Sequence, residues 1–140
     1  MKNNDITLTM IKPAAFKNNH AGSILKIIYE NGFQIIALKI FQLTFYNAQQ
    51  FYIIHKDKPF YEELCKYMSS GPIVAAILKK ENAVNNYRKL IGTTDPAKAE
   101  KGTIRSLFGT SIQKNSVHGS DSDENAKIEC DFFFSELERF

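Results

Sequence analysis

The sequence has few cysteines and no long hydrophobic run. Its two cysteines, Cys65 and Cys130, stand far apart, and neither belongs to a CxxC pair. A disulfide framework and a zinc site are therefore excluded, and both thiols are expected to be small buried side chains in a reducing cytosol. The longest uninterrupted apolar run, residues 73–78, is far too short to span a membrane.

A strong charge of either sign is also missing. Eighteen basic and 15 acidic residues give a formal net charge of +3, and no basic run occurs. A DNA-binding surface is therefore disfavoured, although a few basic side chains in a cleft would still attract a small anion. The N-terminus lacks the apolar stretch of a signal peptide. We expect one domain, residues 1–140, that is soluble and cytoplasmic and binds neither a membrane nor a specific nucleic acid.

Hydrophobic periodicity predicts strands that alternate with helices. Strands are expected over residues 6–11, where Pro13 ends the pairing, and over 33–43, 73–78 and, briefly, 115–118. Helices are expected over 23–31, 44–55, 59–68, 82–92 and about 122–134. Thr44 and Asn82 are the expected caps of the second and fourth helices, and Asp121 with Glu124 is the expected cap of the last. This order predicts an α+β fold, a ferredoxin-like βαββαβ sandwich in which helices cover a four-stranded antiparallel sheet.

One of the three histidines stands in an unusual context. His118 follows an extended pair and precedes a tight Gly-Ser-Asp turn, in the stretch NSVHGSDS. A histidine buried for packing needs no such turn, whereas one that a reactant must approach does. His20 lies in a polar turn and is expected to be solvated, and His55 is expected at a helix end, where positive charge suits the helix dipole. His118 is therefore the candidate reactive residue.

Glu129 is a candidate partner for that histidine. It shares a helical face with Ala126 and Phe133, so it is expected to point inward with them. A buried carboxylate needs a polar partner, and a histidine from the preceding turn would provide one and stay neutral and oriented. In the other interpretation, Glu129 lies at the edge of the face and reaches solvent. The pattern alone does not decide between the two.

Phosphate binding through a glycine-rich loop is excluded, because neither a Walker motif nor G-x-G-x-x-G occurs. Positive side chains would have to take that role. Lys12 lies at the end of the first strand, which is an unusual place for a lysine that is merely solvated. Arg88 and Arg105 flank the polar loop 92–102, which contains Thr94. Each alone is more often a surface residue, but an arginine fork matches the oxygens of a phosphate well.

Six segments in a fixed order resemble one known family. They are MIKPAAF, FYIIHKDKPFYEEL, MSSGPIVAAIL, ENAVNNYRKLIGTTDP, GTIRSLFG and NSVHGSDS. Their order and spacing are similar to those of nucleoside diphosphate kinases, in particular the shorter chains typical of bacteria. The likeness covers essentially the whole chain, and the histidine segment is its most specific part.

The resemblance implies a ping-pong phosphoryl transfer that maintains nucleotide pools. By likeness, Nδ1 of His118 takes the γ-phosphate of a nucleoside triphosphate and passes it to a nucleoside diphosphate. Lys12 matches the lysine that reaches the transferred phosphate, and Tyr52 matches a tyrosine near that lysine and the histidine. Ser120 and Glu129 match the pair that supports the histidine.

The remaining matches concern substrate binding. Phe60 matches the aromatic residue on which the base stacks, which implies poor selectivity among bases because every base has a π-face. Arg88, Thr94 and Arg105 match phosphate-binding positions, and Asn115 matches the residue that meets the sugar hydroxyl. Mg²⁺ would bind through the phosphates of the nucleotide, so no dedicated metal ligand is expected on the protein.

The family forms homo-oligomers, and the sequence does not choose between a tetramer and a hexamer. Ile6, Ala14 and Asn47 depart from the family pattern, and at Asn47 a capping box begun by Thr44 lacks its usual Glu. None of these departures falls on the expected catalytic set. Two alternatives stay open: a non-catalytic nucleotide-binding module, which would not need His118, and a DNA-binding protein, which the mild charge disfavours.

Overall fold

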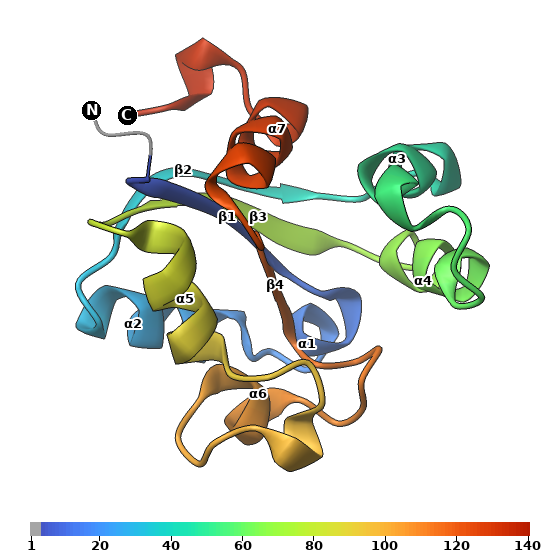
Figure 1. Cartoon of the computed structure of the whole chain (residues 1–140), viewed down its shortest axis with the longest axis horizontal. Coiled ribbons are helices and arrows are strands. Elements are labelled where there is room, and N and C mark those ends of the chain that lie inside the picture. Colours follow the sequence, from blue (N-terminus) through green and yellow to red (C-terminus); the bar gives the residue numbers. More distant parts are fainter. Residues whose placement is uncertain (1–3) are drawn as a thin grey trace.

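Helices pack against both faces of a four-stranded sheet in the computed structural model, which describes residues 4–140 (Figure 1). The strands are β1 (Ile6–Ile11), β2 (Gln34–Phe41), β3 (Ile73–Lys79) and β4 (Val117–Gly119). Their order is β2-β3-β1-β4, and neighbouring strands run antiparallel. The predicted ferredoxin-like arrangement is confirmed.

The helices are α1 (Pro13–Lys17), α2 (Ala21–Glu30), α3 (Phe45–Phe51), α4 (Tyr61–Met68), α5 (Ala83–Ile91), α6 (Ile104–Phe108) and α7 (Asp123–Phe133). Single 3₁₀ turns occur at Ile53–His55, Pro96–Lys98 and Glu136–Glu138. Figure 1 shows α7 on one face of the sheet and α2 with α5 on the other, while α3 and α4 pack together at one end. Within residues 4–140, each helix is too short or too polar to cross a lipid bilayer.

The sheet carries a hydrophobic core on each face because side chains alternate along a strand. Leu8 and Met10 of β1 belong to the core under α7, whereas Ile11 belongs to the core under α2 and α5. Burying a large aliphatic side chain completely stabilises a fold by roughly 1.5–3 kcal/mol, so β1 at the centre of the sheet contributes to both layers. Cys65 and Cys130 are buried free thiols in the first of these cores, as expected.

Two short helices are missing from the elements expected from the sequence. Pro13 does not merely end β1 but occupies the first position of α1, where its missing N–H is harmless. Helix α6 begins at the cap Thr103, whose hydroxyl accepts from the Ser106 amide, and its five residues are too few to show a period. The helix expected from Thr44 to His55 instead ends at Phe51 and continues as a 3₁₀ turn.

The expected caps need three corrections. Ser122, not the Asp121–Glu124 pair, caps α7 by accepting the Asn125 amide. Asn82 precedes α5 with a positive φ of 50° and makes no side-chain cap. The box at Thr44 does not lack its partner: Asn47 is short, yet its Oδ1 accepts from the Thr44 amide at 3.1 Å while the Thr44 hydroxyl accepts from the Asn47 amide at 3.0 Å.

The expectation that His20 is solvated is also wrong. Its ring lies 5.0 Å from the ring of Phe108, and the side chain is only partly exposed. The turn before α2 therefore packs against the end of α6. This contact could not be predicted because α6 itself was not expected.

The capping box yields a prediction about stability. Replacing Asn47 with Ala should lower the free energy of unfolding by about 0.5–1 kcal/mol, because the Thr44 amide loses its acceptor at the start of α3. Asn47→Glu, which restores the usual box, should stay within about 0.5 kcal/mol of the parent. Urea denaturation measures both, with Gln50→Ala on the same helix as control. Equal effects of Asn47→Ala and Gln50→Ala would contradict the cap.

Candidate active site

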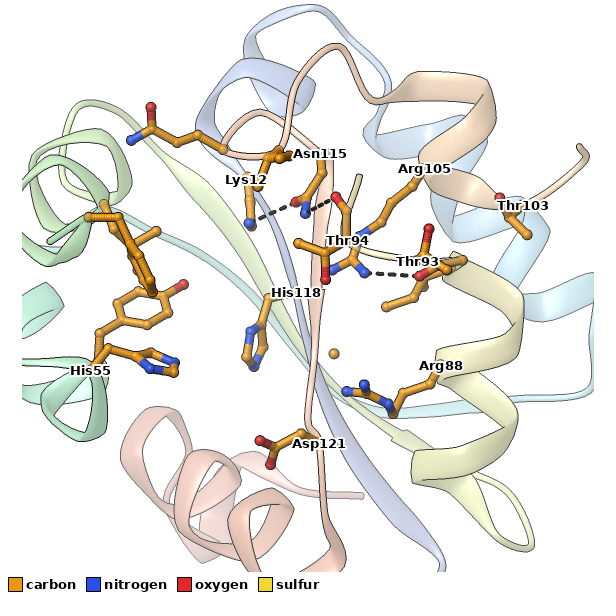
Figure 2. A pocket seen from close by; sticks show the side chains of 18 of the residues that line it. Lys12, His55, Arg88, Thr93, Thr94, Thr103, Arg105, Asn115, His118 and Asp121 are labelled. Atoms are coloured by element: carbon orange, nitrogen blue, oxygen red, sulfur yellow. Dashed lines mark hydrogen bonds between the residues drawn. The ribbon is translucent and has the colours of Figure 1, made fainter. Parts of the chain in front are cut away.

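A cavity of about 1070 Å³ opens beside β4, between α3–α4 on one side and α5 with the loop after it on the other. Nine of the ten site residues expected from the sequence line it: Lys12, Tyr52, Phe60, Arg88, Thr94, Arg105, Asn115, His118 and Glu129. The tenth, Ser120, is fully buried and contacts Glu129. Figure 2 shows Lys12, Arg88, Arg105 and His118 grouped around the same space.

His118 lies in the short strand β4 and is oriented by a carboxylate. Its Nε2 is 2.8 Å from Oε1 of Glu129, and the hydroxyl of Ser120 donates to the same oxygen at 2.7 Å. Glu129 therefore points inward, with 15% of its side chain exposed. An ionised carboxylate can only accept, so Nε2 carries the proton and Nδ1 keeps its lone pair. The geometry thus leaves Nδ1, on the other side of the ring from Glu129, as the nitrogen available for chemistry.

Aromatic rings limit the freedom of that imidazole. The ring of Phe51 meets it edge-on at a centroid distance of 5.4 Å, and the ring of Tyr52 does so at 6.4 Å. The Tyr52 hydroxyl is buried and has no hydrogen-bond partner within residues 4–140. Burial, with the nearby charge of Glu129, raises the pKa of Tyr52, so the phenol stays protonated and available as a donor.

A chain of polar contacts joins the end of β1 to the loop after α5. Lys12 is 7% exposed and donates from Nζ to Oδ1 of Asn115 at 2.8 Å. Asn115 in turn donates to the backbone carbonyl of Thr94 at 3.0 Å. Burial, and then the nearby Arg105, lowers the pKa of Lys12 to about 7. An anion that enters the cavity would raise the pKa of Lys12 again and favour its charged form.

The two arginines are held differently. Arg105 donates from Nη1 to the carbonyl of Gly92 at 3.0 Å and from Nη2 to that of Val117 at 2.9 Å. Burial lowers the pKa of Arg105 to about 10, which still leaves it charged at neutral pH. Arg88 is exposed on α5 and follows the buried Tyr87. Arg105 is thus fixed to the main chain of the site, while Arg88 is free to adjust.

Gly92 allows the loop after α5 to fold back over the cavity. Its φ is +89°, and a Cβ there would lie 2.6 Å from Oγ1 of Thr103. Any other residue would meet both a strained backbone and a collision with a buried neighbour. This return brings Thr94 and Arg105 to the same side of the cavity.

Sequence reasoning missed several residues at the open end of the cavity. Ile112 lines it together with the expected Phe60, and both side chains are half-exposed or more, so apolar side chains from two separate segments lie at this cavity. Gln113 donates from Nε2 to the carbonyl of Glu63 at 3.0 Å and joins those two segments. His55, expected only to end a helix, also lines the cavity, with its ring 5.7 Å from that of Phe60. Ile112 gave no signal because it lies in a polar loop without periodicity.

The cavity brings several cationic side chains together. Lys12, Arg88 and Arg105 line it beside His118, and within residues 4–140 no group of three or more His, Cys, Asp or Glu side chains is placed to hold a metal ion. Cationic forks and an oriented imidazole together suit a phosphoryl group.

Comparison with known proteins agrees with this geometry. Residues 5–139 match the family described as nucleoside diphosphate kinase. The nucleoside diphosphate kinase of Persephonella marina is 54% identical over 132 residues, 94% of each chain, and that of Flavobacterium psychrophilum is 56% identical over 134 residues, 96% of each chain.

Solved structures show the same likeness in three dimensions. The Aquifex aeolicus nucleoside diphosphate kinase superimposes with a TM-score of 0.95 at 45% identity, over 97% of this chain and 99% of that one. The Halobacterium salinarum nucleoside diphosphate kinase in complex with CDP gives a TM-score of 0.93 at 29% identity, over 98% and 91% of the two chains. The chain therefore belongs to the nucleoside diphosphate kinase family.

Proposed function

We propose that this chain transfers the γ-phosphate of a nucleoside triphosphate to a nucleoside diphosphate, with His118 carrying the phosphoryl group between two half-reactions. The observation that supports this most is the contact of 2.8 Å between Nε2 of His118 and Glu129, beside the cationic wall formed by Lys12, Arg88 and Arg105. A binding module would not need an imidazole held in this way.

In the first half-reaction, the Nδ1 lone pair attacks the γ-phosphorus. The bond from that phosphorus to the β–γ bridging oxygen breaks, and the diphosphate leaves with the electron pair. The Nε2 proton stays on the ring, and Glu129 stabilises the positive charge that the ring gains. In the second half-reaction, a terminal β-phosphate oxygen of another diphosphate attacks the phosphorus, the P–N bond breaks and the imidazole is restored.

The surrounding side chains supply position and charge, which phosphoryl transfer needs most. Lys12 and Arg105, which are held by hydrogen bonds, would contact the phosphates from one side. The exposed side chain of Arg88 would reach them from α5. The Thr94 side chain and the unpaired Tyr52 hydroxyl would add neutral donors. All of these side chains line the same cavity, so substrate binding requires no large rearrangement of the protein.

The outer part of the cavity suits a nucleoside. Phe60, half exposed at the mouth, offers a face for stacking a base, and Ile112 lines the same cavity. Such contacts recognise the flat face that all bases share, so the enzyme should accept purines and pyrimidines. Asn115, which already links Lys12 to the Thr94 carbonyl, would meet the sugar hydroxyl.

Mg²⁺ is expected to arrive with the nucleotide. The donor set fits this, because lysine and arginine bind phosphate oxygens and leave the metal to the phosphates themselves. When bound with the nucleotide, the ion would help to neutralise the negative charge of the phosphates. Lys12, Arg88 and Arg105 would hold the phosphates that carry it.

We further infer a single functional unit over residues 1–140, a cytoplasmic location and assembly into a homo-oligomer, tetramer or hexamer. The two free thiols suit a reducing compartment. Strand β2 lies at the edge of the sheet, and its Leu38 and Ile40 side chains are 50% and 65% exposed. An exposed apolar edge strand is a natural pairing surface for a second copy.

The role of His118 is tested by exchanging each cavity histidine in turn. With γ-labelled ATP and Mg²⁺ but no acceptor, the parent chain should gain acid-labile label that chases into GTP when GDP is added. His118→Asn should lose the label but keep nucleotide binding, whereas His55→Asn, in the same cavity, should still be labelled. Label on His118→Asn would contradict the mechanism. Binding without label in the parent would favour a non-catalytic nucleotide-binding module.

The lowered pKa of Lys12, about 7 in the free protein, predicts pH-dependent binding. The amine is charged below that pKa and neutral above it, so its attraction for phosphate is lost as pH rises. Bound phosphates raise the pKa of Lys12 again, so ADP binding should be accompanied by uptake of a proton. The affinity for ADP should fall by at most about tenfold per pH unit above pH 7. Titration calorimetry in buffers of different ionisation enthalpy measures both. Lys12→Arg, always charged, should remove the effect; the same proton uptake in that variant would contradict the assignment.

The assembly through β2 is tested by placing a charge on it. Ile40→Lys should reduce the particle mass measured by light scattering, because an unpaired charge would be buried between two copies. Ile128→Lys, equally exposed but on α7, serves as the control and should keep the parent mass. An unchanged mass for Ile40→Lys would place the interface elsewhere.

A further inference from the structure

A buried hydrogen-bond chain ends on the main chain of His118. The Thr9 hydroxyl of β1 donates to the His118 carbonyl at 2.9 Å, and the Tyr87 hydroxyl of α5 lies 2.6 Å from the same Thr9 oxygen. Both side chains are completely buried. Thr9 has one hydroxyl hydrogen and uses it on the carbonyl, so Tyr87 must donate to Thr9. The order of donation is therefore Tyr87 to Thr9 to His118.

The strand that presents His118 needs such support. β4 has three residues and, within residues 4–140, pairs only with β1, where His118 is opposite Met10. Two successive carbonyls of this edge strand accept from side chains: Val117 from Arg105 at 2.9 Å and His118 from Thr9. Side chains therefore supplement a ladder that is too short to set its own position firmly.

Packing brings α5 directly against the residue after the histidine. A Cβ built on Gly119 would lie 3.0 Å from Cδ2 of Tyr87 and 3.1 Å from Cδ1 of Ile91. The ring of Phe33 meets Tyr87 edge-on at 5.6 Å and limits its movement. The Tyr87 hydroxyl thus reaches Thr9 from a fixed ring.

We propose that Thr9 and Tyr87 are positioning residues that set the main chain of His118 relative to α5. Arg88 is the next residue along that helix, so the same contacts place the backbone of Arg88 relative to His118. The inference rests on the proposed role of His118. Neither Thr9 nor Tyr87 lines the cavity, so both act through His118 rather than on the substrate.

The test separates the rate of phosphorylation from stability and binding. In Thr9→Val the carbonyl loses a donor and the Tyr87 hydroxyl is left buried without an acceptor. The single-turnover labelling rate at saturating ATP should fall by about two- to tenfold, the range expected for one hydrogen bond. ADP affinity should remain within about twofold of the parent, and the unfolding midpoint in urea should fall. Thr9→Ser, which restores the hydroxyl, should recover the rate.

The double variant Thr9→Val/Tyr87→Phe distinguishes positioning from a merely structural role. Removing both hydroxyls means that no Tyr87 hydroxyl is left buried without an acceptor, so stability should return toward that of the parent. The labelling rate should stay as low as in Thr9→Val, because the His118 carbonyl still lacks its donor. A rate that recovers together with stability would overturn the proposal.

Two further variants complete the design. Thr7→Val lies two residues earlier in β1, also completely buried, and its hydroxyl has no partner among the described residues, so its labelling rate should be unchanged. Should Thr9→Val fail to fold, Tyr87→Phe tests the same chain: a loss of about twofold or more is expected, and the parent rate would overturn the proposal. Absence of label in the parent itself would instead refute the proposed function.

Discussion

The hydrogen bond between His118 and Glu129 is the contact on which the rest of the site depends. Nε2 of His118 lies 2.8 Å from a carboxylate oxygen of Glu129, whose side chain has little exposure, and in the proposed mechanism this contact leaves Nδ1 as the reacting atom. A carboxylate buried in this way is costly unless it is satisfied, and Ser120 satisfies the same oxygen while its own oxygen accepts from the Leu8 amide. The reactive residue is thus linked to the central strand of the sheet.

Positive charge is the second constraint, because Lys12 is buried and the partly buried Arg105 is close enough to lower its pKa. The pKa values of Lys12 and Arg105 are lowered to about 7 and about 10, mainly by burial. Neutral oxygens accept their hydrogen bonds, the Asn115 amide from Lys12 and main-chain carbonyls from Arg105, while the buried Nε of Arg105 has no partner within residues 4–140. Neutral partners leave the positive charge uncompensated until an anionic substrate enters. The arrangement therefore lowers the stability of the free protein at this site and raises its affinity for the anion.

Periodicity could predict the sheet and the long helices, and the local NSVHGSDS segment pointed to His118, whereas Tyr52, Phe60, Asn115 and Ser120 were expected only from the resemblance to the family. It could not predict α1 and α6, whose five residues show no period. Nor could it decide whether Glu129 points inward, since that depends on where β4 places His118. The role of Asn47 as a cap and the ring contact between His20 and Phe108 also arise only from local geometry and tertiary contact. Ile112 and Gln113 reach the cavity from a loop without any pattern.

The most direct measurement of the central claim is the position of the phosphoryl group on the imidazole. After reaction with ATP and Mg²⁺, phosphorus–nitrogen coupling in a chain carrying ¹⁵N-labelled histidine identifies the bonded atom. The account predicts coupling to Nδ1 of His118, because Glu129 holds the proton on Nε2. Coupling to Nε2, or a phosphoryl group on any other residue, would contradict it.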